Sequence, residues 1–535
     1  MADAPPSDLL RWPAASLQGL QRQIVREWRS GPIHQFSIAG PRPRGLALRP
    51  RDFRPSDPAR GTEVLAGAFR YGGQSLDAAD PWRQASPSRR FATWLHGFGW
   101  APDLLATGEE GEGAALRLWL DWRRVFGRYN AFAWSGEPLE RRVFNLTCAT
   151  PAIILRASEA EAAALLDSLA RQARHLLTDD EDPGREAERA CVAALAGAAL
   201  VGPAGDRMLA RSLARLAKAA PQAVLRDGVH ASRSPERGLE LLFDLLALDD
   251  ALSQRGAPAP LDVARSIDRL GAAVRFFSLP GARLPAFNGG EAGTPSRAAT
   301  ALALEAAASE PPTSVPYGRF HRLETRSLAI LVDAGGSGHG CPQTGAIEVV
   351  ADGRWRLIVG SAASSKTAPG ESPRGPHGGS CLTLGESWPA PSDVEVERRE
   401  GDGAVWLDLA FGGWSRELGL TCLRRLYLDD KAGELRGEDA MTPSGAARRG
   451  TSSFEIRFRL APGVAAQIAA DGHSALIRPG GGPGWRLRSD VELRLEPGVI
   501  FEAGAPQASE VLILAGIVSL AKGARIRWKL SRDSS

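Results

Sequence analysis

The stretch RDGVHASRSPERGLELLFDLL, residues 226–246, carries the strongest indication of how this chain folds. Its second half repeats apolar residues every three or four positions, which predicts an amphipathic helix. That helix is expected to begin at Pro235, because proline is favoured in the first helical turn, with Ser234 or Arg233 at the cap position. His230 and Arg233 therefore lie in a loop at a helix entrance.

His230 and Arg233 are candidate functional residues. A histidine near neutral pH can act as a base or as a hydrogen-bond donor, and a guanidinium forms paired bonds with carboxylate or sulfate groups. The alternative interpretation is a structural histidine in a polar turn, and composition alone favours neither interpretation.

Helical periodicity surrounds this stretch from about residue 85 to residue 310. Blocks rich in Ala, Leu and Arg have amphipathic spacing, and short segments with Gly and Pro separate them, so neighbouring helices are expected to pack antiparallel. Helical hairpins in series are what a closed ring of helices requires. The predicted helices include residues 114–129, 159–177, 184–200, 206–220 and 261–277.

The apolar period changes to two after the linker ASEPPTSVPYG, residues 308–318. Asp-Gly turns at Asp352, Asp402 and Asp471 and a turn at residues 431–433 indicate hairpins. A dozen or so short strands predict a large antiparallel sandwich. The predicted strands lie at 327–335, 345–352, 354–361, 380–385, 393–400, 404–411, 422–429, 452–460, 474–479, 491–496 and 525–530.

Length and charge limit the possible organisation and partners. A chain of 535 residues is too long for one core, so we expect a lead-in at residues 1–60, a helical domain at 61–310 and a sandwich at 311–535. The net charge is only +3, and Lys and Arg are spread along the chain. This distribution argues against nucleic acid as the main partner.

The cysteines and the apolar segments indicate a cytoplasmic location. The five cysteines are widely spaced without a Cys-x-x-Cys pair, which is typical of reduced thiols. The first twenty residues lack the basic start and continuous apolar run of a signal peptide, and no segment is apolar enough to span a membrane. We therefore expect no membrane partner.

Eight segments occur in an order that resembles the heparinase II/III-like family of polysaccharide lyases. The resemblance covers most of the chain after about residue 60. It implies an incomplete α/α toroid of helical hairpins followed by an antiparallel β-sandwich, with a sugar groove between them. The segments are WLHGFGWAPDL (94–104), GREAERA (184–190), DGVHASRSPE (227–236), RLPAFNGGEAG (283–293), FHRLE (320–324), RGPHGGSCLTLGE (374–386), RRLYLDDKAGELRGED (424–439) and FEIRFRLAPG (454–463).

The family resemblance implies β-elimination at a uronic acid, with an acidic glycan as substrate. A proton next to an ionised carboxylate is weakly acidic, so donors must hold the charge that develops when a base removes it. His230 matches the histidine of the helical motif and is the first candidate for the base or the carboxylate partner. Arg233 and Asn288 are candidates for binding the substrate carboxylate.

Further candidates come from two aromatic or basic segments. His96 and Trp100 could belong to a wall that stacks on sugars, although helix packing is the favoured interpretation. Arg374 and His377 lie in a polar loop, residues 364–379, that could cover an anionic sugar, although such loops are more often simply solvated.

The chain departs from the family pattern at the proton-transfer positions. Some family members have an asparagine where Val229 stands. The family's catalytic tyrosine corresponds to residues 275–288, which contain phenylalanines and no tyrosine, and phenylalanine cannot transfer a proton. Tyr317 is the replacement that we consider.

Two histidine positions of the sandwich also differ. The family's sandwich histidine corresponds to Gly379, with His377 two residues earlier. Arg459 and Ala461 stand where zinc-bearing members have histidines. Since a zinc site needs three or four converging ligands, we expect no metal and no other cofactor.

The sequence thus supports three functional hypotheses. The first is a lyase that cleaves an acidic, uronate-containing glycan, with His230, His377 or Tyr317 as catalytic groups. The second is a catalytically degenerate glycan-binding or scaffold protein of the same fold. The third is a cytoplasmic housekeeping role on an oligosaccharide or a cell-envelope precursor. Convergence of His230, Asn288 and either His377 or Tyr317 would favour chemistry.

Overall fold

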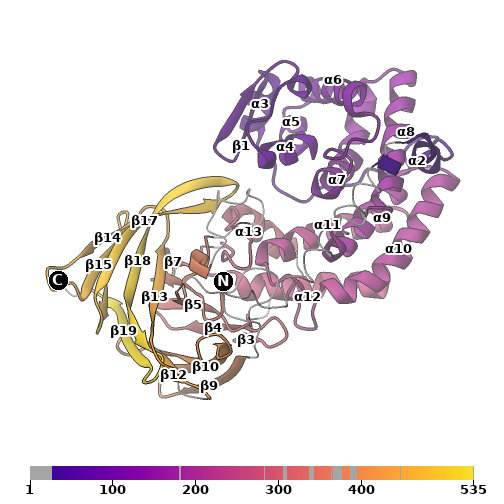
Figure 1. Ribbon diagram of the computed structural model, residues 1–535. Helices are drawn as coiled ribbons and strands as arrows, with labels where there is room; N and C mark the ends of the chain where they lie inside the picture. Colours follow the sequence, from indigo (N-terminus) through magenta and orange to yellow (C-terminus); the bar gives the residue numbers. More distant parts are fainter. Residues whose placement is uncertain are drawn as a thin grey trace, which may run out of the picture.

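The computed structural model describes residues 27–29, 31–179, 182–281, 283–304, 310–336, 343–362, 364, 376–385, 394–445 and 448–533. A helical half precedes a β half along the chain. Figure 1 shows the strands of the β half gathered at the lower left and the helices extending from them to the upper right.

Antiparallel helical hairpins build the incomplete α/α toroid. The helices predicted from periodicity are confirmed to within a few residues at most of their ends, and the helix after His230 begins at Pro235 as expected. The helices are α6 (Glu109–Phe126), α7 (Gly136–Ile153), α8 (Glu159–Leu176), α9 (Glu186–Ala199), α10 (Pro203–Ala223), α11 (Pro235–Gln254), α12 (Leu261–Phe277) and α13 (Pro295–Leu304).

The central helix of this array is α9. All its residues from Ala187 to Ala199 are buried, because α7, α8, α10 and α11 pack around it. Small side chains allow this approach: a Cβ on Gly197 would lie 2.5 Å from the backbone nitrogen of Leu209 in α10. Apart from Glu188 and Arg189, whose charges are paired, the buried residues of α9 are small or apolar, as expected of a central helix.

A lead-in and a small hairpin precede the toroid helices. They comprise α2 (Pro32–Ile38), α3 (Pro58–Leu65), β1 (Ala68–Tyr71), β2 (Gln74–Asp77), α4 (Arg89–His96) and α5 (Ala101–Leu105). The sequence analysis missed the hairpin of β1 and β2, whose strands have only four residues each. A Cβ on Gly72 in its turn would lie 2.6 Å from the carbonyl oxygen of Gly504, so this turn contacts the sandwich.

The β half is a sandwich of two antiparallel sheets. One sheet has the strand order β14-β15-β16-β19-β12-β11-β10-β9, and the other has β17-β18-β13-β7-β6-β5-β4-β3, with β8 pairing with β13. The strands are β3 (Ser314–Val315), β4 (Phe320–Glu324), β5 (Leu328–Asp333), β6 (Ile347–Ala351), β7 (Trp355–Val359), β8 (Leu382–Leu384), β9 (Val394–Gly401), β10 (Ala404–Trp414), β11 (Leu420–Asp429), β12 (Glu434–Pro443), β13 (Thr451–Leu460), β14 (Val464–Ile468), β15 (Ser474–Pro479), β16 (Trp485–Ser489), β17 (Leu493–Glu502), β18 (Ala505–Ser519) and β19 (Ala524–Arg532).

All predicted strands are present, but several are longer than expected and others were missed. β10 has 11 residues and β18 has 15. The expected Asp-Gly turns occur with positive φ at both residues for Asp352 (50°) with Gly353 and for Asp402 (54°) with Gly403. These two turns match the conformation that the right-handed twist of a two-residue hairpin favours.

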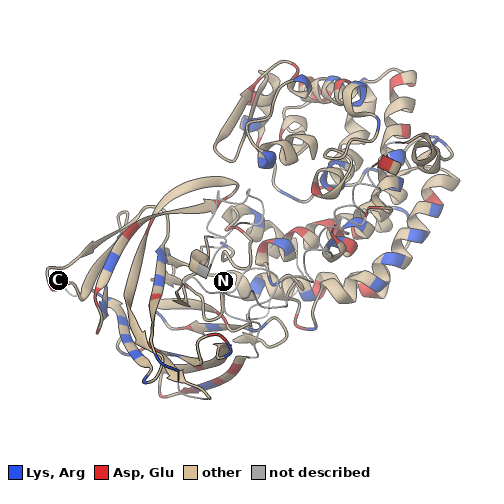
Figure 2. Ribbon diagram, in the orientation of Figure 1, with Lys and Arg blue, Asp and Glu red and all other residues tan. Residues whose placement is uncertain are grey.

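Charges are distributed over both halves. Figure 2 shows Lys and Arg interleaved with Asp and Glu along the helices and across the strands. Within the ranges given above, no helix is long and apolar enough to cross a bilayer.

Candidate functional site

The loop between α10 and α11 places His230 and Arg233. A short ladder closes the loop, in which Leu225 N donates to Val229 O at 2.9 Å and Ala231 N donates to Ala223 O at 2.7 Å. Ser234, not Arg233, is the cap of α11, since its hydroxyl accepts a hydrogen bond from the backbone of the helix.

Gly228 allows the loop to pack against α12. Its φ is +88°, and a Cβ there would lie 1.8 Å from the carbonyl oxygen of Arg269. A residue other than glycine would therefore clash and be strained at this position.

His230 is buried and faces the helical interior. Its Nδ1 accepts hydrogen bonds from the backbone nitrogen of Ser232 (3.1 Å) and from the Ser232 hydroxyl (2.7 Å), so the neutral ring carries its proton on Nε2. Nε2 lies 3.5 Å from Glu188 Oε1, and Glu188 also accepts a hydrogen bond from Arg237 Nη2 at 2.9 Å.

The environment of His230 differs from that of a groove-facing base. Burial lowers the pKa of His230, and Glu188 opposes this shift only partly. The ring borders a cavity of about 10 Å³ that is otherwise lined mainly by apolar side chains, among them Leu270, Val274 and Phe277. Such a cavity has room for about one water molecule and none for a sugar ring.

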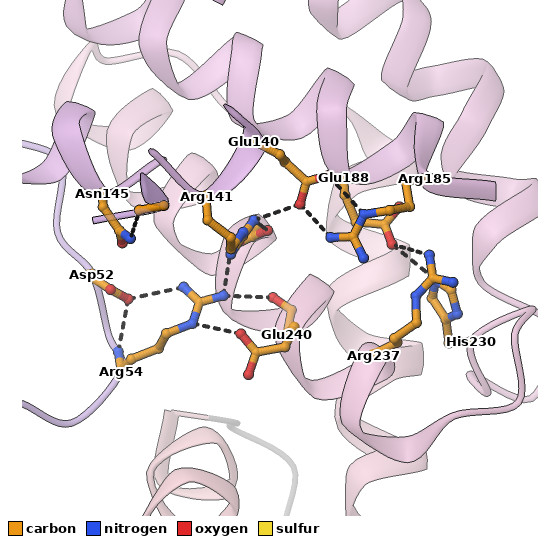
Figure 3. A network of polar contacts seen from close by, with 12 residues as sticks. Asp52, Arg54, Glu140, Arg141, Asn145, Arg185, Glu188, His230, Arg237 and Glu240 are labelled. Carbon is orange, nitrogen blue, oxygen red and sulfur yellow. Dashed lines mark hydrogen bonds and ion pairs between the residues drawn. The ribbon is translucent and has the colours of Figure 1, made fainter. Parts of the chain in front are cut away.

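A buried ion-pair network continues from His230 through the helical half (Figure 3). In this network, carboxylates on α7, α9 and α11 alternate with arginines. Arg185 Nη2 donates to Glu140 at 2.6 Å, Arg141 contacts both Glu140 (3.1 Å) and Asp244 (3.0 Å), and Asp244 accepts from Arg54 at 2.7 Å. The histidine thus lies at one end of a structural network.

Arg233 and Asn288 converge, as the sequence analysis required of a carboxylate site, but they converge on Asp333 of β5. Arg233 Nη2 is bonded to Asp333 Oδ1, and Asn288 Nδ2 donates to Asp333 Oδ2 at 3.1 Å. Arg233 Nε also donates to Gly318 O at 3.0 Å, and its guanidinium lies 4.7 Å from the centre of the Phe320 ring.

Two residues of this cluster have an unusual backbone conformation. Both Arg233 and Asn288 have positive φ, 60° and 51°, a conformation that non-glycine residues adopt rarely. Asp333 is 1% exposed and accepts a further bond from Gly335 N at 2.8 Å. The two candidate carboxylate-binding residues are therefore engaged by an internal carboxylate that joins the helical half to the sandwich.

Tyr317 lies at the junction of the two halves and is 53% exposed. Arg226 Nη1 donates to its hydroxyl at 3.2 Å, and the backbone nitrogens of Tyr317 and Gly318 donate to Asp227 at 2.6 and 2.8 Å. These contacts fix the start of the sandwich against the α10–α11 loop. They turn Tyr317 toward Arg226 and not toward the buried His230.

His377 lies beside β8 and β13. Its Nδ1 is 3.5 Å from Glu455 Oε2 and 3.4 Å from the Thr383 hydroxyl, and its carbonyl accepts a bond from Arg459. The structure thus ties His377 to the sandwich instead of grouping it with His230 or Asn288. Arg374 lies outside the described residues.

The phenylalanines that replace the family's tyrosine are core residues. Phe276, Phe277 and Phe287 are each at most 2% exposed. Phe320 lies between two of them, with ring centres 5.0 Å from Phe277 and 5.4 Å from Phe287. In this part of the structure an apolar cluster occupies the place where the family resemblance implied proton transfer.

The assignment of His96 and Trp100 to a sugar-binding wall is wrong, because both are buried. Trp100 is 1% exposed and donates to Leu95 O at 3.2 Å. His96 Nδ1 accepts a 3.2 Å bond from Trp122 Nε1, and burial lowers its pKa to about 3. Helix packing, the favoured alternative, accounts for both residues.

The sequence analysis missed Asp333 and Glu188. Asp333 ends a strand whose six residues are all buried, and a charge at such a position requires a partner. An aspartate at the end of an apolar strand can be recognised in the sequence. Glu188, in contrast, lies in a predicted amphipathic helix, where a glutamate is ordinary. Among the described residues, no group of three or more His, Cys, Asp or Glu side chains is placed to hold a metal ion.

Comparisons with known proteins agree with this architecture. The family profile "Heparinase II/III-like, C-terminal" matches residues 376–529. A crystal structure of heparinase III has a TM-score of 0.72 at 14% identity, with 89% of this chain and 84% of that chain covered. The heparan sulfate lyase HepC of Pedobacter heparinus has a TM-score of 0.57 at 15% identity, covering 91% and 86%.

A curated protein is similar over the whole length. It is the FtsZ-localized protein C of Caulobacter vibrioides, which is 42% identical over 575 aligned positions that include 99% of this chain and all of the relative. The two solved structures share the fold with this chain, whereas this relative shares much of its sequence over nearly the whole chain.

Proposed function

The chain belongs to the heparinase II/III-like family, and we propose that within this family it is a non-catalytic scaffold that localises with FtsZ. Proteins with the same fold can catalyse different reactions or none, so the function of this chain depends on the residues of its candidate site.

The engagement of Arg233 and Asn288 by Asp333 is the observation that carries the proposal. A uronate lyase must bind the substrate carboxylate with hydrogen-bond donors before a base removes the neighbouring proton. Here the donors already bind a carboxylate that is part of the chain. An incoming uronate would compete with a tethered group, which has the advantage of high effective concentration.

Among the described residues around Asp333, the candidates for a replacement base are engaged elsewhere. His230 is buried against Glu188, and its Nε2 points into the helical half. Phe277 and Phe287 fill the region where a catalytic tyrosine was expected. The cluster therefore acts as a joint between the two halves.

The proposed location comes from the similarity to FtsZ-localized protein C. At 42% identity over nearly the entire chain, the two proteins are expected to share surfaces as well as cores. Localisation with FtsZ is compatible with a protein that binds a partner and performs no chemistry on it.

The competing function is the uronate lyase, and one assay separates the two. Purified protein is incubated with heparin, heparan sulfate, hyaluronan and alginate, and unsaturated uronate is followed by ultraviolet absorbance. We expect no product from the wild type, nor from Asp333→Asn, in which Arg233 loses its internal anion. Product from the wild type that disappears in His230→Ala would establish a lyase.

The location is tested separately. Co-sedimentation with purified FtsZ polymers and imaging of a fluorescent fusion in dividing cells should both show association with FtsZ. A uniform cellular distribution, together with no co-sedimentation, would disprove the FtsZ part of the proposal and leave the lyase result unaffected.

A further inference from the structure

A second pocket lies in the helical half, apart from the loop of His230 and from the Arg233–Asp333 contact. It has a volume of about 190 Å³, and the lead-in, α5 and α7 form its walls. A void needs about 10–15 Å³ to hold one water molecule, whereas pockets for drug-sized ligands have roughly 300–1,000 Å³. The pocket is thus sized for a small molecule.

Arg54 forms one side of this pocket and is already neutralised. It donates through Nη1 to Asp52 (3.1 Å), through Nε to Glu240 (3.0 Å) and through Nη2 to Asp244 (2.7 Å), as Figure 3 shows in part. Burial acts to lower the pKa of Arg54, but these three carboxylates outweigh burial and raise it. An anionic ligand would therefore meet a guanidinium surrounded by carboxylates.

Hydrogen-bond acceptors on the pocket wall retain unused capacity. Asn145 Nδ2 donates to Gly97 O at 2.8 Å, which orients the amide and leaves Oδ1 without a donor among the described residues. Asp52 uses Oδ1 for both the backbone and the side chain of Arg54. Its second oxygen has no such donor in the described part of the chain, so the pocket can accept hydrogen bonds from a ligand that brings donors.

The remaining wall is mostly apolar. Pro102, Leu105 and Ala149 line it beside the polar groups, and Ser56 stands at the exposed rim. Small-molecule sites are usually lined by apolar side chains together with a few polar groups that orient the ligand. Such a surface suits the C–H face of a sugar ring, while hydroxyl groups supply donors to the acceptors.

We propose that this pocket binds a small, uncharged polyhydroxylated molecule of about monosaccharide size, with Asn145 and Asp52 accepting its hydroxyl hydrogens. The proposal does not depend on the function proposed above, because no residue of the pocket belongs to the Arg233–Asn288–Asp333 cluster.

Isothermal titration calorimetry of the full-length protein tests the proposal with D-glucose, N-acetyl-D-glucosamine and D-glucuronate. We expect saturable binding of at least one of the two neutral sugars and much weaker binding of glucuronate, which Asp52 repels. Asn145→Leu should weaken binding about tenfold or more, because it removes the acceptor and fills space. Arg117→Ala, on the exposed face of α6, should leave binding unchanged.

A second variant, Ser56→Phe, tests the pocket independently in case Asn145→Leu does not fold. Ser56→Phe places bulk at the exposed rim, keeps the Asn145–Gly97 bond, and should also weaken binding. Absence of saturable binding of both neutral sugars to the wild type would overturn the proposal. So would wild-type affinity in the folded Ser56→Phe or Asn145→Leu protein, or equal affinity for glucuronate.

Discussion

Asn288 Nδ2 donates a 3.1 Å hydrogen bond to Asp333 Oδ2, and this bond links the end of the helical half to the sandwich sheet that contains β5. The other Asp333 oxygen is bound by Arg233. The residues that the family resemblance assigned to a substrate carboxylate thus stabilise the joint between the two halves.

Removing the internal carboxylate should destabilise the protein strongly. Asp333→Ala leaves Arg233 largely buried without its anion, and breaking such a pair typically costs about 3–5 kcal/mol. Urea denaturation measures the change. The matched control is Asp121→Ala, which breaks the exposed pair with Arg124 and should cost about 1 kcal/mol or less. Equal effects of the two variants would contradict the role given to Asp333.

Gly335 should be intolerant of a side chain because Arg233 packs against it. A Cβ at Gly335 would lie 2.1 Å from Arg233 Cζ, whereas a Cβ at Gly293 meets no atom within 4 Å. We expect Gly335→Ala to lower the free energy of unfolding by about 1–3 kcal/mol. Gly293→Ala should change it by less than about 0.5 kcal/mol. A thermal melt that does not distinguish the two variants would refute the packing argument.

Stability should fall in acid because buried histidines resist protonation. Burial lowers the pKa of His175 from 6.5 to about 3. The unfolded chain therefore takes up a proton below pH 6.5 that the folded chain refuses until about pH 3. Each such histidine lowers the free energy of unfolding by about 1.4 kcal/mol per pH unit across that window, and has no effect above it.

The variant His175→Gln tests this pH dependence. Urea denaturation between about pH 7 and pH 5 should show a shallower loss of stability in His175→Gln than in the wild type. His473→Gln, at an exposed position, should keep the wild-type slope. Identical slopes for all three proteins would show that His175 does not titrate as proposed.

A second contact between the halves should be visible in amide hydrogen exchange. Buried Glu291 accepts bonds from Arg90 Nη2 (2.5 Å), from the Ser364 hydroxyl (2.5 Å) and from Gly504 N (2.9 Å). Glu291→Ala should accelerate exchange of the Gly504 amide about tenfold or more, since hydrogen bonds to charged groups contribute about 1.5–3 kcal/mol.

The half-exposed Glu324 provides the control for that experiment. Glu324→Ala removes a pair with Arg322 on β4 and should leave the Gly504 amide unchanged. Unchanged exchange of Gly504 in Glu291→Ala itself would show that the carboxylate does not hold the β17–β18 turn.

Most of the fold could be predicted because it depends on local periodicity. The helices α8 and α12 follow amphipathic spacing, and their bounds agree with the prediction almost residue for residue. Strand β12 was implied by the hairpin turn at residues 431–433 but was given no bounds, because its sequence ELRGEDAMTP lacks a clear alternation of apolar and polar residues. Its position is fixed by pairing with β11 and β19, which a local pattern does not report.

The candidate site was predicted only in part because its partners are distant in sequence. The entrance of α11 and its residues Arg233 and His230 could be located from the cap and the proline. Asp333 lies 100 residues away from Arg233, and Glu188 lies on α9, whereas His230 lies in the loop before α11. Whether Arg233 can bind a ligand therefore depends on Asp333, a partner that is distant in the sequence and that local patterns do not reveal.

The buried ion-pair network of Figure 3 has an evolutionary consequence. Glu140 is shared by Arg141 and Arg185, and Asp244 by Arg54 and Arg141, so a change at one position leaves two partners unsatisfied. Single substitutions would be removed by selection before a compensating change arose. In an alignment of relatives, these positions should therefore be inherited or exchanged as a block.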